Sequence, residues 1–369
     1  MKKTIDFIRK NTVMSIAFFA ALITSFIVPA DKKYIEYFDF KTLTCLFCVL
    51  AVVCALKNID FFYILAQKVV RIFKNARAAI TALVYITFIG SMLIANDMAL
   101  LTFLPLGYFV LTSTQKEKYM CFTFIMQNIA ANLGGMLTPF GNPQNLYLYT
   151  KFNIPTVEFM KIMAPPFVIS ITIITICCFI FVHPESLKIS DISPKFNKKR
   201  TAIYILLFLL SIAIVFRTIP YLIGLAVIFP ALLIMDRKAL KMVDYPLLLT
   251  FVFFFVFAGN MARITLVQEV FEYLLGRNTL VFSILSCQLI SNVPSAILLS
   301  QFTGSYTELL LGVNIGGVGT LISSLASLIT FREYTRYNPR RAMRYVGIFT
   351  AFNFGFLILL TVSEILILS

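Results

Sequence analysis

The residues best suited to chemistry in this sequence are polar segments that interrupt long apolar runs. Asn96-Asp97 interrupts residues 78–112, and Ser291-Asn292-Val293-Pro294 interrupts residues 278–303. An acidic side chain at the centre of a membrane helix costs about 2.5 to 3.5 kcal/mol on insertion scales, so such residues are usually functional. Asp97, which we take to be the sole acidic residue deep in an apolar run, therefore predicts a proton carrier or a cation ligand. The alternative is a hairpin cap, whose carboxylate accepts backbone N–H bonds.

Two further polar segments resemble each other at a fixed offset of 182 residues. Ala131-Asn132-Leu133-Gly134-Gly135-Met136-Leu137-Thr138 aligns with Val313-Asn314-Ile315-Gly316-Gly317-Val318-Gly319-Thr320, and the two share the Asn, both Gly and the final Thr. Small polar residues follow each copy, as Gly141-Asn142-Pro143-Gln144-Asn145 and as Ser323-Ser324 with Ser327. This pattern predicts an internal repeat in which each copy breaks an apolar run.

The glycine pairs and Pro139 predict helices that stop in the middle of the membrane. A stopped helix leaves free carbonyl groups at one end, which suit Na⁺, and free N–H groups at the other, which suit an anion. Asn, Thr and Ser side chains add uncharged oxygen atoms. The alternative is close helix packing, for which Gly312-x-x-x-Gly316 is a motif in its own right.

Composition requires a membrane to surround these segments. The chain has 369 residues, of which 59% are apolar and 13% charged, with a mean hydropathy of +0.88. Soluble domains have about 45 to 50% apolar and about 25% charged residues, so we expect an all-α polytopic membrane protein of one domain. The seven cysteines all lie in apolar runs, and the Cys45-x-x-Cys48 pair lacks the βαβ setting of a redox motif.

Apolar runs predict about nine transmembrane helices and two re-entrant hairpins. The hairpins are residues 78–112 and 278–303, because each has its polar break in the middle and such backbone is tolerated only inside protein or beside a wet cavity. Residues 58–76 and 264–276 mix charged and apolar residues and predict helices on the membrane surface. The nine predicted spans are 12–30, 40–56, 119–150, 158–183, 201–216, 219–235, 246–262, 306–330 and 346–367. We interpret the first as a retained helix, since it exceeds the apolar part of a signal peptide.

The distribution of Lys and Arg predicts the orientation. The net charge is +15. In the topology above, alternate segments beginning with residues 1–10 hold 24 of the 32 basic residues and the opposite segments hold 8. Basic residues concentrate on the cytoplasmic side of membrane proteins. We therefore expect a cell (inner) membrane protein with a cytoplasmic N-terminus and an external C-terminus, and the charge indicates contact with lipid headgroups rather than nucleic acid.

In this topology the two copies cross the membrane in opposite directions. Residues 1–183 form the first inverted repeat, residues 184–216 a connecting loop and helix, and residues 217–369 the second repeat. Inverted repeats with interrupted spans at matching places are typical of secondary transporters and indicate where the substrate binds. A passive channel is the alternative, because broken helices also line pores. An intramembrane enzyme is disfavoured, because one His and one deep Asp supply no catalytic set.

These motifs resemble the ion transporter superfamily, which includes arsenite permeases, NhaD-type sodium/proton antiporters, and citrate and divalent-anion symporters. The resemblance is closest to bacterial citrate-transporter-like anion permeases and includes Phe257-Ala-Gly-Asn260. It implies two hairpin tips and two broken helices around one substrate site flanked by cation sites. It also implies an elevator movement of one half against a scaffold, usually within a homodimer.

The resemblance assigns site residues to both copies. The implied substrate-binding residues are Asn96, Asp97, Asn132, Thr138, Asn142, Asn145, Ser291, Asn292, Asn314, Thr320 and Ser324. The implied cation-coupling residues are Asp97, Asn96, Asn132, Gly135, Gly141, Ser291, Asn292 and Gly317.

The hairpin tips of this chain differ from those of the sodium-coupled dicarboxylate carriers that it resembles, which have Ser-Asn-Thr at both tips. Here Val293 lacks the hydroxyl of a second sodium site, and Asp97 offers a protonatable group instead. We expect secondary active transport of a small anion, a di- or tricarboxylate or an inorganic oxyanion, by elevator-type alternating access. The coupling ion is Na⁺ or H⁺, and no cofactor or bound metal is expected. The alternative is a cation/proton antiporter or an arsenite efflux permease that uses Asp97.

Overall fold

The computed structural model describes residues 12–70, 72–187 and 198–368. Within these ranges the chain is built from α-helices and short 3-10 helices, and its one extended pairing is an isolated bridge between Asn75 and Ser186. The prediction of an all-helical membrane protein is confirmed. The 3-10 helices are η1 (Lys32–Tyr37), η2 (Glu117–Tyr119), η3 (Gly135–Leu137) and η4 (Pro339–Arg341).

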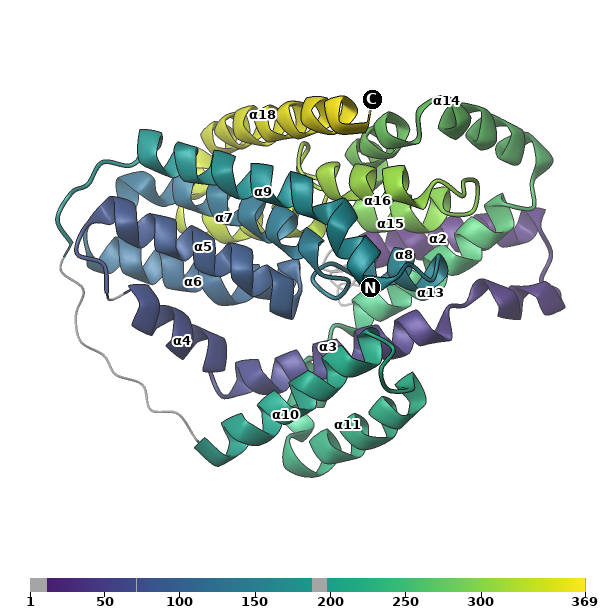
Figure 1. Ribbon diagram of the computed structural model, residues 1–369, viewed down its shortest axis with the longest axis horizontal. Helices are drawn as coiled ribbons and strands as arrows, with labels where there is room; N and C mark the ends of the chain where they lie inside the picture. The colour runs from purple at the N-terminus through teal and green to yellow at the C-terminus, as the bar shows by residue number, and fades with distance from the viewer. Residues whose placement is uncertain (1–11, 71, 188–197, 369) are drawn as a thin grey trace.

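The helices pack as two groups (Figure 1). In the first group α2 packs along α13, and α3 packs against α10, α11 and α12. Apolar side chains dominate these contacts, and α3 buries almost the whole of its second half. The first group consists of α2 (Thr12–Ile27), α3 (Phe40–Asn58), α10 (Lys198–Val215), α11 (Tyr221–Met235), α12 (Arg237–Met242) and α13 (Tyr245–Met261).

The second group surrounds the two broken segments. In it α7 packs against α5, α6, α9 and α17, while α14 packs against α15 and α16. The groups meet where α13 contacts α15 and where α3 contacts α8, and α4 (Phe61–Val70) contacts both groups. The second group consists of α5 (Ala76–Ile94), α6 (Asn96–Ser113), α7 (Met120–Gly134), α8 (Pro143–Lys151), α9 (Thr156–Phe181), α14 (Thr265–Ile290), α15 (Asn292–Leu299), α16 (Tyr306–Ile315), α17 (Leu325–Tyr337) and α18 (Ala342–Leu368).

Six helical segments of the described chain are long and apolar enough to cross a membrane. Helix α5 is one of them although we predicted it as a hairpin arm, and α10 is not among them because it begins with three basic residues, Lys198, Lys199 and Arg200. Three further apolar helices are shorter than these six. The count of nine membrane spans therefore stays a prediction. The six are α3, α5, α9, α14, residues Glu117–Leu137 and Pro339–Leu368, and the shorter ones are Val13–Ile27, α11 and α13.

The predicted breaks within the apolar runs are confirmed. Helix α7 ends at Gly134 and the chain resumes as α8 at Pro143, while α16 ends at Ile315 and the chain resumes as α17 at Leu325. The packing alternative holds as well, because a Cβ on Gly134 would lie 2.7 Å from Ser91 Oγ of α5. Glycine therefore serves both to stop α7 and to bring it close to its neighbour.

Helix α14 bends at Asn278, which has the non-helical angles φ −165° and ψ 93° (Figure 1). The Asn278 side chain accepts a hydrogen bond from Val281 N at 2.8 Å and so caps the second half of the helix. The bend falls between the predicted surface helix, residues 264–276, and the predicted second hairpin. The arms of that hairpin are shorter than α5 and α6, so the two hairpins differ in length.

Candidate functional site

Both hairpins turn through a single residue with the same backbone conformation. Ala95 has φ 62° and ψ 149°, and Ser291 has φ 74° and ψ 159°, a region that side chains other than glycine seldom adopt. The next residue in each tip bonds to a broken segment, with Asn96 N donating to Gly141 O at 3.1 Å and Asn292 N donating to Ser323 O at 2.9 Å. Gly141 and Ser323 are 182 residues apart, which is the offset of the sequence repeat.

Asparagine side chains join the first tip and both breaks into one buried network. Asn96 Nδ2 donates to Asn132 Oδ1 at 3.2 Å, and Asn142 Nδ2 donates to Asn132 O at 3.2 Å and to Asn314 Oδ1 at 3.3 Å. Asn314 Nδ2 donates to Asn145 Oδ1 at 2.6 Å. All five side chains are buried, so these bonds replace those that water would otherwise make.

Most of the other predicted site residues support this network. Thr138 Oγ1 donates to Met92 O at 2.7 Å, Thr320 N donates to Gln288 Oε1 at 2.9 Å, and Ser324 caps α17. Asn145 Nδ2 also contacts the carbonyl of Gly135, and Gly317 lies beside Asn292 and Asn132. The structure thus brings the predicted residues of both copies together, and the predicted site extends from this network to the hairpin tips.

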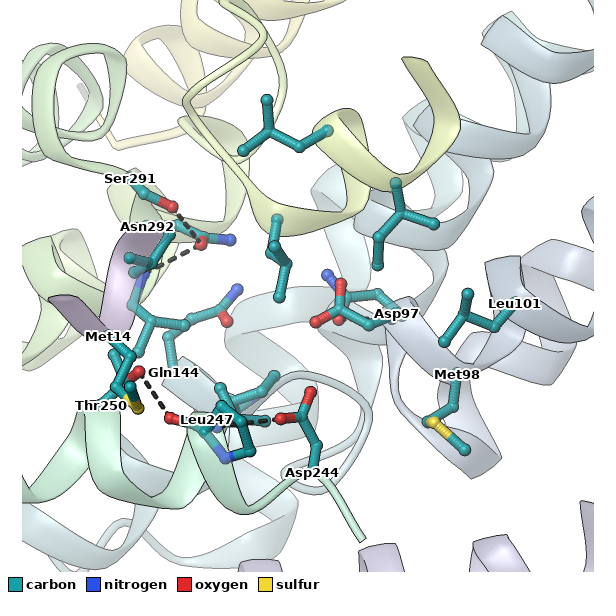
Figure 2. A pocket seen from close by; sticks show the side chains of 18 of the residues that line it. Met14, Asp97, Met98, Leu101, Gln144, Asp244, Leu247, Thr250, Ser291 and Asn292 are labelled. Atoms are coloured by element: carbon teal, nitrogen blue, oxygen red, sulfur yellow. Dashed lines mark hydrogen bonds between the residues drawn. The ribbon is translucent and has the colours of Figure 1, made fainter. Parts of the chain in front are cut away.

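A cavity of about 600 Å³ lies between the two helix groups, in contact with both tips. Its volume falls in the range of small-molecule sites. Four predicted residues line it directly: Asn96, Asp97, Ser291 and Asn292. The remaining predicted residues do not line the cavity. Figure 2 shows the tip residues and Gln144 arranged around the cavity.

Five helices begin at this cavity. Their first residues or N-caps line it, and they come from both helix groups: α6, α8, α13, α15 and α17. The N-terminus of a helix has unpaired N–H groups and a positive partial charge. Their convergence makes the cavity suited to an anion.

Asp97 and Asp244 extend their carboxylates into the same part of the cavity (Figure 2). Asp244 Oδ1 accepts a hydrogen bond from Leu247 N at 3.0 Å and so caps α13. Asp97 Oδ1 is buried, and the described residues offer it no hydrogen-bond partner. The cap interpretation of Asp97 is therefore wrong, because the start of α6 has no side-chain cap bond among the described residues, and the Asp97 N–H itself donates to Asn96 Oδ1 at 2.9 Å.

The predicted site omitted five polar residues that line the cavity: Lys57, Gln144, Asp244, Thr250 and Arg332. The charged ones lie near the ends of apolar runs, where they resemble ordinary flanking residues. Asp244 was the only one of these with a local sequence signal, because an Asp directly before an apolar run is typical of a helix N-cap. Nothing local in the sequence indicates that Lys57 and Arg332 face one cavity.

Asp97 is also not the only buried acid in a predicted span, which corrects our expectation. Glu364 in α18 is 1% exposed, and its Oε1 has no partner among the described residues. We overlooked it because it lies near the end of residues 346–367. It does not line the cavity.

A cluster of charges lies outside the helices at the opposite end of α6. Glu185 accepts hydrogen bonds from Lys116 Nζ at 2.6 Å, Lys118 Nζ at 2.5 Å and Tyr119 Oη at 2.7 Å. The Lys116 and Lys118 bonds lower the pKa of Glu185 to about 2. This cluster fastens the chain after α9 to the turn between α6 and α7 and forms no part of the cavity.

Comparison with known proteins decides the family. Residues 4–308 match a family described as citrate transporter. The chain belongs to the citrate transporter family. It is 35% identical over 313 residues to an uncharacterized transporter of Methanocaldococcus jannaschii, across 84% of this chain and 85% of that one. It is 28% identical over 323 residues to inner membrane protein YbiR of Escherichia coli, across 84% of each chain.

The predicted resemblance to citrate-transporter-like proteins is confirmed. This citrate transporter family member is a multi-pass membrane transporter. Its six apolar helices are long enough to cross a membrane, and the Methanocaldococcus jannaschii relative is named as a transporter. Membership in a transporter family also favours transport over catalysis. A transporter of this kind implies a substrate and a surrounding bilayer.

Proposed function

We propose that this protein is a secondary active transporter that carries a small anion, a di- or tricarboxylate or an inorganic oxyanion, together with Na⁺ or H⁺. The observation that carries the proposal is the convergence of five helix N-termini on one cavity between two helix groups. Uncharged amides at Asn96 and Asn292 add hydrogen bonds with little cost of desolvation. Such a site binds negative charge without holding it so tightly that release is prevented.

Asp97 supplies the coupling. Its Oδ1 atom has no protein partner among the described residues, so it is available to a proton or a cation. An anion in the cavity favours the protonated form of a nearby carboxyl, and by linkage the protonated form favours the anion. Binding of both together is the condition for cotransport.

Alternating access follows from relative movement of the two groups. The second group contains both tips and both breaks. The asparagine network ties the first tip to the two breaks, and the Asn292 N to Ser323 O bond ties the second tip to its break, so the group can move as one body against the first group. The matching tip geometries support an inverted repeat of residues 1–183 and 217–369. We place the protein in the cell membrane as a homodimer, with its N-terminus in the cytoplasm and its C-terminus outside. The name of the Escherichia coli relative agrees with an inner membrane.

The second candidate function is cation/proton antiport or arsenite efflux. The unpartnered Asp97 oxygen favours it, since an exchanged cation would bind there. The anion proposal is preferred because the helix N-termini around Asp97 repel a cation.

Counterflow in proteoliposomes tests the proposal. Vesicles with purified protein and preloaded with unlabelled anion should accelerate uptake of the same labelled anion, because a carrier exchanges faster than it returns empty. Non-saturating flux without acceleration would indicate a channel instead. Uptake driven by an imposed Na⁺ or pH gradient then identifies the coupling ion.

A further inference from the structure

A second cavity, of about 360 Å³, also lies between the two helix groups. We call it the outer cavity, and we call the cavity lined by both hairpin tips the tip cavity. Phe255 of α13 lines the outer cavity from the first group, and Tyr147 of α8 lines it from the second. In the predicted orientation its charged residues Glu36 and Lys151 lie on the external side, whereas the charged residues at helix ends beside the tip cavity lie on the cytoplasmic side.

Four helices extend from one cavity to the other. In the order α3, α8, α15 and α13, each helix contacts the next, and α13 contacts α3 again. Helices α8, α13 and α15 begin at the tip cavity, and Lys151, Gly259 and Gln301, at or near their far ends, line the outer cavity. Helix α3 runs the other way, from its N-cap Asp39 at the outer cavity to Lys57 at the tip cavity. The two cavities therefore lie at opposite ends of one ring of helices.

The layer that separates the two cavities is thin. On α8, Gln144 lines the tip cavity and Tyr147 lines the outer cavity. These residues are three positions apart, which is about 4.5 Å along a helix axis. On α13, Thr250 and Phe255 are related in the same way and are five positions apart, about 7.5 Å. Both lengths are small beside the hydrocarbon core of a bilayer, which is about 30 Å thick.

Aromatic side chains fill this layer. Tyr147 and Phe255 are both buried, and their ring centroids are 5.6 Å apart. Phe251, also buried, lies 6.0 Å from Phe255. The Tyr147 hydroxyl shares a hydrogen bond of 2.9 Å with Ser300 Oγ and accepts one of 3.3 Å from Gln301 Nε2. Tyr147 is thus held from two sides, and its ring contact with Phe255 crosses the interface between the helix groups.

Arg217 holds α8 in this position. It lies between α10 and α11 of the first group, and its Nη2 atom donates to Tyr149 O in the last turn of α8. Its guanidinium lies 4.0 Å from the centroid of the Tyr149 ring. A cation is favourable both at the C-terminus of a helix and over an aromatic face. The end of α8 that is remote from the tip cavity is therefore fastened to the first group.

We infer that Tyr147 and Phe255 form the barrier that closes the transport path, and that the outer cavity is the entrance to this path from the opposite face of the membrane. The inference rests on the proposed function and deepens it, because alternating access requires one closed point between two openings. Opening this barrier requires α8 to separate from α13. That movement parts the two rings and breaks the bond between Arg217 and α8, so it is coupled to movement of the two groups.

Labelling of introduced cysteines from each face of the membrane tests the barrier. Leu247→Cys reports on the tip cavity (Figure 2), and Thr150→Cys reports on the outer cavity. Both are made in full-length protein in which Cys54, which lines the tip cavity, is replaced by Ala. A membrane-impermeant methanethiosulfonate is applied on ice to intact cells or to inverted membrane vesicles. With Tyr147 intact, each cysteine should react from one face only, and the two faces should differ.

Truncation of the barrier should remove this difference. In Tyr147→Ala and in Phe255→Ala, Leu247→Cys should react from both faces, because the aromatic layer between the cavities is lost. Tyr147→Phe keeps the ring and should retain reaction from one face. Tyr345→Ala is the matched control, because it removes another fully buried tyrosine ring that lines neither cavity.

Melting temperatures show which variants are folded. Reaction from one face in both folded barrier variants, or reaction from both faces in Tyr345→Ala as well, would overturn the inference and leave the proposed function intact. Reaction of Leu247→Cys from both faces while Tyr147 and Phe255 are intact would also overturn it. Labelling requires no substrate, so absence of counterflow would overturn the proposed function without altering the labelling pattern.

Discussion

Asn314 in the second break donates a hydrogen bond of 2.6 Å to Asn145 in the first, although 169 residues separate them in the sequence. Asn314 also accepts from Asn142 at 3.3 Å, so one amide satisfies two residues of the other copy. The two copies thus meet through side chains rather than only through apolar packing. This contact fixes the breaks, and the breaks in turn hold the tips through Gly141 and Ser323.

Loss of this amide should weaken both the fold and binding. Asn314→Ala leaves the buried Asn145 oxygen without its donor and removes one of the two acceptors of the Asn142 amide, which costs about 1 to 3 kcal/mol. We expect a lower melting temperature in detergent and weaker anion binding in counterflow, and the same direction for Asn132→Ala. Gln268→Ala, which removes an exposed amide bonded to Glu272, is the matched control. Wild-type melting and affinity for both network variants would contradict the assigned role.

Replacement of Asp97 should separate exchange from coupling. Asp97→Asn keeps the size of the side chain but removes the protonatable group beside the cavity. We expect counterflow to persist while accumulation driven by a pH or Na⁺ gradient is lost, because exchange does not require the coupling ion to dissociate. Asp39→Asn, in the N-cap of α3 and outside the cavity, should retain both activities. Gradient-driven accumulation by Asp97→Asn at the wild-type level would refute the assignment.

The strained tips predict an unusual response to glycine. Ala95 has a positive φ of 62°, a conformation that costs about 1 to 3 kcal/mol for a residue with a side chain. Ala95→Gly should therefore raise the melting temperature, and Ala95→Val should lower it. Ala99 lies four residues later, inside α6, where glycine costs about 1 kcal/mol of stability relative to alanine, so Ala99→Gly should lower the melting temperature. Equal responses to glycine at both positions would show that the tip is not strained.

The Glu185 cluster predicts a pH-dependent contribution to stability. The pKa of Glu185 is about 2 in the folded protein and lies near 4.5 when unperturbed. A depressed pKa stabilises the fold above the unperturbed value, and that stabilisation is lost as pH falls toward the folded value. Glu185→Gln should therefore lower the melting temperature at pH 7 and have less effect near pH 3. Glu117→Gln, an exposed carboxyl in the same region, is the control. A difference that grows on acidification would exclude the cluster as the cause.

The sequence by itself determined the class of protein, the breaks and the likeness of the two segments that contain them. These features are local: apolar runs exceed what water tolerates, Gly-Gly and Pro stop a helix, and the 182-residue offset is visible without coordinates. The same local signals identified Asn96, Asp97 and Asn292, because a polar residue within a membrane-embedded apolar run costs free energy in any fold.

Only the tertiary structure decided which polar residues share the cavity. Lys57 and Asp244 lie at helix ends and Arg332 directly follows an apolar run, places where charged residues are common in membrane proteins, so their types and spacing indicated nothing special. They share one cavity because of the way α3, α13 and α17 pack around it. The structure likewise showed that Asn132, Asn142 and Asn314 do not line the cavity, because their amides bond one break to the other. Burial of Glu364 has the same origin, because packing of α18 against other helices and not the sequence around it removes that carboxyl from the surface.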